Sequence, residues 1–239
     1  MRVLDLFSGI GGFSVGLERA GYRTAAFCEI DPFCQRVLAR HWPETPCYDD
    51  VRELTAARLV HDGVGPIDVI TGGFPCQDIS LAGRMRGVDG EKSSMWRELA
   101  RIVEETRPSF VILENSPVLR SRGLDEVLSR FAEIGYDAEW HCLPLNAIGA
   151  PHRRDRVWVI AYPVGFGDGL PEGQVCTGRH LAQHSARWST EPNVRRVDDG
   201  FPDGSHRRRV LGNAVCPSVP EIIGRALIEA QGYQTRLAA

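Results

Sequence analysis

Hydrophobic and polar positions along the first 160 residues form blocks that predict strands and helices in alternation. Apolar runs with the length of buried β-strands lie at 3–7, 25–28, 67–70, 110–113 and 156–161. Helical spacing of the apolar side chains predicts amphipathic helices over 13–20, 96–103 and 219–230. Short strands separated by helices are typical of an α/β domain whose mostly parallel sheet is covered on both faces.

Three residues mark the ends of predicted helices. Gly21 directly follows the first helix, where a left-handed residue commonly ends a helix. Asp31 is placed to cap the next helix, and Pro32 would occupy its first position, where the missing N–H costs nothing.

The apolar periodicity fades after about Pro163 and returns near Val210. We therefore divide the chain into a main domain at 1–163, a short irregular segment at 164–209 and a C-terminal segment at 210–239. The irregular segment is expected to form a small lobe, and the C-terminal segment is expected to return to the main domain.

The composition excludes several classes of protein. With 239 residues, 43% hydrophobic and 25% charged, the chain is ordinary for a soluble globular protein. No apolar run approaches the ~20 residues that a membrane helix needs, and Asp5 interrupts any signal-peptide core. The seven cysteines show no zinc spacing, so we expect free thiols in the cytoplasm and no bound metal.

The net charge of −3 gives the chain as a whole no attraction for nucleic acid. Residues 179–209, however, hold seven arginines against four acidic residues. Such a basic segment is either a local contact for phosphates or a solvated surface, and the sequence leaves both interpretations open.

Glycine or polar residues follow several predicted strands. These clusters come after Phe7, at Glu29, at Asp50, after Ile70 and at Glu114. Because ligands of parallel sheets bind beyond the carboxyl ends of the strands, we expect a small-molecule site at this edge.

The first cluster is the stretch DLFSGIGGF at 5–13, between the first strand and the first helix. Its glycines allow a ligand to approach the backbone, and the helix offers free N–H groups at its start. The adjacent Gly11 and Gly12 do not fit the dinucleotide fingerprint GxGxxG, and a purely structural turn is the alternative. Glu29 is placed to accept ribose hydroxyls, unless it is an ordinary surface acid.

A second cluster, at 72–80, presents Cys76 directly after Pro75 at the mouth of a strand. Its glycine and polar neighbours favour a nucleophile over an inert core thiol. Glu114 would lie beside Cys76 if their strands are neighbours, either as a protonated acid or as a hydrogen-bonded strand-end carboxylate.

Arg154 and Arg156 alternate along one predicted strand and therefore face the same side. Two arginines on one face suit an anionic or polar ligand. A structural ladder of ion pairs is the alternative, and the sequence does not decide between the two.

The ordered series DLFSGIGG, Glu29, GGFPCQ, ENSP, PHRRDR and LGNAV resembles the motif series of the cytosine-C5 DNA methyltransferases. The resemblance covers residues 2 to about 220 apart from the variable segment, and it is specific because all the motifs occur in order. It implies a Rossmann-like class I methyltransferase fold in a small enzyme of the phage or bacterial type. It also implies S-adenosyl-L-methionine as the cofactor, with S-adenosyl-L-homocysteine as its product.

The resemblance assigns roles to four residues. Cys76 would add to C6 of a cytosine flipped out of the duplex, and C5 would then take the methyl group. Glu114 would stabilise this adduct through N3, Arg156 would contact the base near O2, and Arg154 would hold the site and phosphates. Loss of the C5 proton would expel the thiolate and leave 5-methylcytosine.

The resemblance also implies the ligand contacts. The cofactor would be bound by Phe7, Gly9, Gly11, Gly12, Glu29, Ile30, Asp50, Val51, Pro75, Met95, Asn213 and Ala214. DNA would be contacted by Gln77, Arg84 and Arg86 in a lid over 77–92 and by Arg179 and Arg187 in the recognition segment 164–209. Further candidates for sequence recognition are His180, His184 and Trp188.

The chain departs from the family pattern at three places. His152 replaces the usual glutamine of the arginine motif, and Ser116 and Pro117 replace the usual residues after Glu-Asn. The recognition segment is also much shorter than in typical members. A short target site or a loose sequence preference is therefore expected.

The sequence leaves other functions open. A related branch of the family methylates transfer RNA, although its Cys-Phe-Thr motif is missing from this chain. A catalytically silent DNA-binding relative and a small-molecule thiol enzyme on the same fold are further alternatives. For the methyltransferase we expect a monomer that acts on double-stranded DNA, with a restriction endonuclease of a restriction-modification system as a potential partner.

Overall fold

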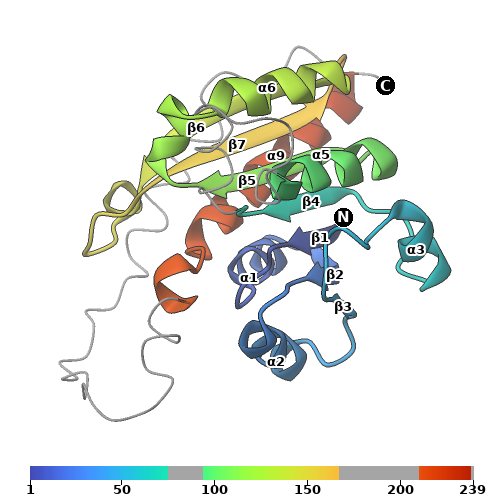
Figure 1. The fold of residues 1–239 in the computed structure, drawn as a ribbon. Helices are drawn as coiled ribbons and strands as arrows, with labels where there is room; N and C mark the ends of the chain where they lie inside the picture. The colour runs from blue at the N-terminus through green and yellow to red at the C-terminus, as the bar shows by residue number, and fades with distance from the viewer. Residues whose placement is uncertain (75–93, 167–209, 238–239) are drawn as a thin grey trace, which may run out of the picture.

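The structure is a computed structural model that describes residues 1–74, 94–166 and 210–237. Within these ranges, seven strands form one sheet in the order β3-β2-β1-β4-β5-β7-β6 (Figure 1). The strands are β1 (Arg2–Leu6), β2 (Arg23–Cys28), β3 (Cys47–Tyr48), β4 (Val69–Gly72), β5 (Phe110–Asn115), β6 (Tyr136–Pro144) and β7 (Asp155–Pro163). The sequence pattern did not predict β3 and β6, but the mixed α/β fold class is confirmed.

β7 runs opposite to its neighbours, because it pairs antiparallel with both β5 and β6. The sheet is mostly parallel, as predicted, and the sequence pattern does not indicate that 156–161 is its antiparallel strand. An apolar run does not encode strand direction, and the short connection from β6 through η2 (Leu145–Ile148) permits only antiparallel pairing. After β5, the chain passes through η1 (Pro117–Ser121) to α6 (Leu124–Glu133). The antiparallel direction brings the start of β7 to the carboxyl end of β5.

Alternate side chains of the strands point to opposite faces of the sheet and build two cores. On one face, Leu4 and Val111 belong to a buried cluster with side chains of α6, of α3 (Ala56–His61) and of α5 (Ser94–Thr106). These helices supply large apolar side chains that complete this core, which also contains Val51 and Leu54 from the loop after β3.

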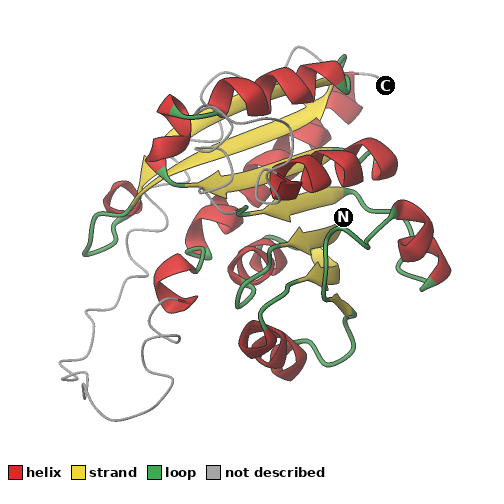
Figure 2. Ribbon diagram, in the orientation of Figure 1, coloured by secondary structure: helices red, strands yellow, loops and turns green. Residues whose placement is uncertain are grey.

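The opposite face is covered by helices from the two ends of the described chain. Val3 and Ile112 pack there with α1 (Gly12–Arg19) and α9 (Ser218–Leu237). The hydroxyl of Tyr22 donates to the carbonyl oxygen of Gly224 at 2.9 Å and ties α9 to the segment after α1. Helices therefore cover both faces of the sheet (Figure 2).

The predicted helix ends have the expected local chemistry. The Asp31 side chain accepts the N–H of Phe33 at 2.8 Å, and Pro32 opens α2 (Pro32–His41). Gly21 follows α1 with a left-handed φ of 96°. In the described ranges, no helix is long and apolar enough to cross a membrane.

Candidate active site

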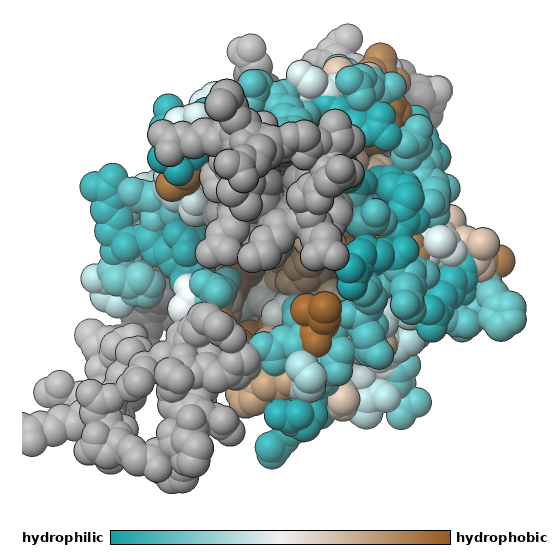
Figure 3. All heavy atoms as spheres, in the orientation of Figure 1, coloured by the Kyte–Doolittle hydropathy of each residue, from teal (hydrophilic) through white to brown (hydrophobic). Residues whose placement is uncertain are grey.

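A cavity of about 320 Å³ opens at the carboxyl ends of the parallel strands. It adjoins the switch point between β1 and β4, where the order of the sheet reverses and where α/β sheets bind ligands. The coloured residues of the face drawn in Figure 3 are mostly hydrophilic, with a few apolar residues near its centre. The described residues that line the cavity are Phe7, Ser8, Gly9, Cys28, Glu29, Ile30, Asp31, Cys34, Asp49, Asp50, Val51, Gly73, Met95, Glu114, Val210, Asn213, Ala214 and Val215.

The lining contains most of the residues that the sequence motifs assign to the cofactor. They are Phe7, Gly9, Glu29, Ile30, Asp50, Val51, Met95, Asn213 and Ala214. Sequence reasoning did not single out Val210 or Val215, which belong to the returning C-terminal segment. Motifs distant in the chain thus meet at one cavity.

The glycines between β1 and α1 serve two different purposes. Gly9 has a left-handed φ of 54°, and a Cβ added there would meet nothing within 4 Å, so its backbone is open to a ligand. A Cβ on Gly11 would come within 2.7 Å of the Trp42 ring, and one on Gly12 would overlap the carbonyl oxygen of Val215. Gly11 and Gly12 therefore allow close packing around the start of α1. They are not among the lining residues, and their contact with a cofactor stays a prediction.

The carboxylate of Glu29 is fixed by main-chain groups at the end of β2. Its Oε2 accepts the N–H of Gly9 at 2.7 Å, and its Oε1 accepts the N–H of Asp31 at 2.8 Å. A carboxylate has about four lone-pair sites, so Glu29 can still accept hydrogen bonds from a ligand. The neighbouring Ile30 is 69% exposed and adds an apolar side chain to the cavity.

The cavity wall is acidic. Its described residues include no lysine, arginine or histidine, and the acids among them are Glu29, Asp31, Asp49, Asp50 and Glu114. The guanidinium of Arg52 bonds the Asp50 carboxylate, with Nε 2.9 Å from Oδ1, and holds the pKa of Asp50 below its usual value. A wall with this charge repels phosphates and favours a cationic ligand.

Glu114 occupies a different environment in the same cavity, near the end of β5. It is 7% exposed, and Nε of Arg156 lies 2.7 Å from its Oε1. Burial raises the pKa of Glu114, while the charges of Arg156 and Arg154 oppose this rise. A buried carboxyl group that holds a proton nearer to neutral pH can act as an acid toward a ligand.

Arg154 connects the start of β7 to the returning C-terminal segment. Its Nη1 donates to the carbonyl oxygen of Gly212 at 2.7 Å. Burial and the like charge of Arg156 lower the pKa of Arg154. Its Nη2 is buried without a hydrogen-bond partner among the described residues, which leaves a donor that a ligand could satisfy.

β4 and β5 are neighbours, as the hypothesis on the second cluster requires. A Cβ on Gly73 would lie 3.5 Å from Oε2 of Glu114. The side-chain amide of Asn115 donates to the carbonyl oxygen of Phe74 at 3.0 Å. The chain that leads to Cys76 therefore leaves the sheet beside Glu114.

The remaining predicted site residues lie outside the described part of the chain, and their roles stay predictions. They are Pro75, Cys76, Gln77, Arg84, Arg86, Arg179, His180, His184, Arg187 and Trp188. Among the described residues, no group of three or more His, Cys, Asp or Glu could hold a metal ion.

Asp5 is a buried polar residue that sequence reasoning did not select. It lies inside β1 and accepts the hydroxyls of Ser14 and Thr71, each at 2.8 Å. Burial raises its pKa to about 7, against the lowering effect of these hydrogen bonds. Asp5 thus ties β1 to β4 and α1 next to the glycine loop. A single charge inside the apolar run 3–7 is the signal that could have revealed it.

The chain is similar to known DNA-modifying proteins. The profile of a family described as C-5 cytosine-specific DNA methylase matches residues 1–177. The Type II methyltransferase M2.BsuMI of Bacillus subtilis (strain 168) is 34% identical over 169 residues, which are 67% of this chain and 42% of that protein. The Type II methyltransferase M.CviJI of Paramecium bursaria Chlorella virus IL3A is 37% identical over 218 residues, 90% of this chain and 56% of that protein. The chain spans about half the length of these two relatives.

A solved structure has the same fold. It is described as a DNA modification methyltransferase encoded within a prophage (E. coli), and it is 29% identical with a TM-score of 0.58. The match covers 68% of this chain and 47% of that chain. The fold that the sequence motifs imply is therefore confirmed.

Proposed function

This chain belongs to the C-5 cytosine-specific DNA methylase family, and we propose that it transfers a methyl group from S-adenosyl-L-methionine to C5 of cytosine in double-stranded DNA. The observation that carries the proposal is one cavity with Glu29 and Gly9 in one wall and the buried Glu114, which is paired with Arg156, in another. A methyl group passes between two ligands only when both are held at one site. The cavity offers one wall for the methyl donor and another for the cytosine.

The wall at the ends of β1, β2 and β3 fits S-adenosylmethionine better than a ligand with phosphates. Its described acids are Glu29, Asp31, Asp49 and Asp50. A sulfonium nucleoside carries positive charge and no phosphate, so an acidic wall attracts it. Glu29 would accept the ribose hydroxyls, because two main-chain N–H groups hold its oxygens in place and leave lone pairs free.

Further lining residues would complete the cofactor contacts. Ile30 and Val51 would flank the adenine, and Asp50 would contact its amino group. Met95, Asn213 and Ala214 also line the cavity and would close its remaining sides. When bound, the cofactor supplies the methyl group that cytosine C5 receives.

Cys76 and Glu114 would activate the base together. The Cys76 thiolate would form a bond to C6, which makes C5 electron-rich, while Glu114 donates its proton toward N3 and neutralises the charge that develops there. The raised pKa of Glu114 supports this role, since the group must carry a proton to donate one. After the methyl group is on C5, loss of the C5 proton would break the C–S bond and release Cys76.

Arg156 would hold Glu114 and contact the base near O2. The 2.7 Å contact between Arg156 and Glu114 fixes the carboxyl from the side of β7. Arg154, bonded to Gly212, would keep the returning segment in place and contribute to phosphate binding. The base must leave the duplex to reach such a buried carboxyl.

Methylation of DNA in a cell tests the proposal. The full chain is expressed in a host that lacks DNA cytosine methylation, and 5-methylcytosine is mapped across the genome with Cys76→Ala as the control. We expect methylation in a short sequence context with wild type and none with the variant. A blank map from folded protein contradicts the proposal, and methylation of transfer RNA in the same cells would assign the activity to RNA.

A further inference from the structure

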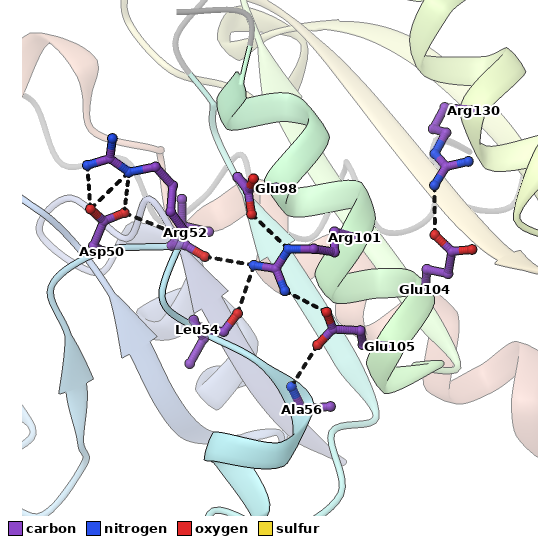
Figure 4. Close-up of polar contacts among 10 residues, drawn as sticks. Asp50, Arg52, Leu54, Ala56, Glu98, Arg101, Glu104, Glu105 and Arg130 are labelled. Carbon is purple, nitrogen blue, oxygen red and sulfur yellow. Dashed lines mark hydrogen bonds and ion pairs between the residues drawn. The ribbon is translucent and has the colours of Figure 1, made fainter. Parts of the chain in front are cut away.

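Arg101 joins α5 to the loop that follows β3 (Figure 4). Its Nη2 donates to the carbonyl oxygen of Val51 at 3.1 Å and to that of Leu54 at 2.8 Å. One guanidinium nitrogen thus holds two main-chain oxygens of the same turn. Hydrogen bonds from a charged donor are stronger than neutral ones, so this contact fixes the turn firmly.

Two glutamates on the same helix orient the guanidinium. Nε of Arg101 donates to Glu98 at 2.8 Å, and Nη1 donates to Glu105 at 2.6 Å. The second oxygen of Glu105 accepts the N–H of Ala56 at 2.9 Å, at the first residue of α3. We call these three residues, Glu98, Arg101 and Glu105, the α5 clamp. Arg101 and Glu105 together bond three main-chain atoms of the segment 51–56.

The clamped loop is part of the cavity wall. Asp50 and Val51 line the cavity, and so does Met95 in the first turn of α5. Val51 is 4% exposed and Leu54 is fully buried, so little water can replace Arg101 as a partner near their carbonyl oxygens. Arg101 is not among the lining residues, and it contacts the wall through the carbonyl oxygens of Val51 and Leu54.

We propose that Arg101 is a positioning residue that sets the affinity of the cavity for its cofactor by fixing the main chain at Val51. The inference rests on the proposed function, because it takes the cavity as the site of S-adenosylmethionine. Without the guanidinium, the wall beside the adenine loses two of its anchoring hydrogen bonds, whereas the contact between Glu114 and Arg156 is untouched. The affinity for the cofactor therefore falls, whereas the rate of the chemical step at saturating cofactor does not change.

The test compares binding with turnover in the full chain. Calorimetry gives the dissociation constant of S-adenosyl-L-homocysteine for wild type and Arg101→Ala, and steady-state methylation of duplex DNA gives KM and kcat. We expect the dissociation constant and the KM for S-adenosylmethionine to rise about tenfold, as when a hydrogen bond to a charged group is lost. At saturating cofactor, kcat should stay within about twofold. Arg101→Lys keeps the charge but not the planar fork, so it should be intermediate.

Arg130→Ala is the matched control. Arg130 lies on α6 and bonds Glu104, which is on the helix of Arg101, at 2.7 Å, and Glu133 at 3.2 Å. It does not line the cavity. This variant also loses exposed ion pairs, so its melting temperature reports the general effect on stability while its dissociation constant should equal that of wild type. The proposal is overturned by an unchanged dissociation constant in Arg101→Ala, or by an equal rise in Arg130→Ala. If Arg101→Ala does not fold, an unchanged dissociation constant in Arg101→Lys overturns it.

Failure of this inference is distinguishable from failure of the proposed function. A wild-type chain that binds no S-adenosyl-L-homocysteine contradicts both. A wild-type chain that binds it and methylates DNA, with variants that bind equally well, contradicts the inference alone.

Discussion

Asp50 and Glu114 line the same cavity, and each is bonded to an arginine, yet their pKa values are shifted in opposite directions. Hydrogen bonds from Arg52 lower the pKa of Asp50, whose side chain is 20% exposed. Burial raises the pKa of Glu114, whose side chain is 9% exposed, although Arg156 is 2.7 Å away. The difference shows that an ion pair does not by itself decide protonation, because the loss of water around a carboxylate can outweigh it.

The two walls of the cavity are therefore suited to different tasks. At the ends of β2 and β3, fixed negative charge, with Glu29 held by two main-chain donors, suits the binding of a cationic nucleoside. Near the end of β5, a carboxyl that retains its proton more readily suits proton donation. Environment thus assigns separate roles to chemically similar groups, as in enzymes that use two carboxylates as acid and base.

Replacing Glu114 should have the largest effect on the chemical step. Glu114→Gln keeps the shape of the side chain but cannot give up a proton, so the single-turnover rate should fall about 100- to 10,000-fold. The dissociation constant of S-adenosyl-L-homocysteine should change by less than about threefold, because Glu29 is untouched. Glu104→Gln, on an exposed side chain of α5, is the control. An unchanged rate in Glu114→Gln would leave Glu114 with a structural role only.

Replacing Glu29 should have the converse effect. Glu29→Gln has one acceptor oxygen in place of two, so it cannot accept the N–H groups of Gly9 and Asp31 and both ribose hydroxyls as the carboxylate can. We expect the dissociation constant for the cofactor product to rise about 10- to 100-fold, with a small change in rate at saturating cofactor. The exposed Glu53→Gln serves as the control. A fall in rate with unchanged affinity would contradict the assignment of cofactor binding to one wall and proton donation to the other.

Asp5 extends the comparison to a carboxyl outside the cavity lining. Its folded pKa of about 7 lies above the ordinary value of 3.8, so the folded state binds the proton more tightly than the unfolded state. The stability from this group is complete below about pH 4 and is lost as pH rises toward 7, with a slope of at most about 1.4 kcal/mol per pH unit.

The variant Asp5→Asn resembles the protonated form at every pH. Its free energy of unfolding, measured by denaturant titration between pH 4 and 8, should lack this decline and exceed that of wild type at the upper end. Parallel curves for the two proteins would show that Asp5 does not titrate in this range.

The site was more predictable from sequence than the two edge strands of the sheet, β3 and β6. Each parallel strand delivers its last residues to one edge, so local motifs after Phe7, at Glu29 and at Glu114 were enough to place the cavity. β6 lies at the edge of the sheet, and its intermediate and exposed residues give no continuous apolar run. β3 has only two residues, which is too short for any periodicity.

The α5 clamp could not be inferred from sequence. Arg101 and Val51 lie 50 positions apart, and an arginine between two glutamates on a helix has the pattern of an ordinary solvated face. Only the folded chain shows that its guanidinium bonds carbonyl oxygens of the cavity wall. Asp5 is a similar case, since its partners Ser14 and Thr71 come from other elements.

Covalent capture of DNA tests whether cytosine C5 is methylated through a Cys76 adduct. Duplex DNA is made with 5-fluorocytosine, which carries fluorine at C5 in place of hydrogen. After methyl transfer there is no C5 proton to remove, so the C–S bond cannot break and the adduct persists. We expect a protein–DNA complex that survives denaturation, requires S-adenosylmethionine and is absent with Cys76→Ala. If wild type methylates ordinary duplex DNA but forms no such complex, or if Cys76→Ala forms it equally, the reaction does not pass through a Cys76 adduct.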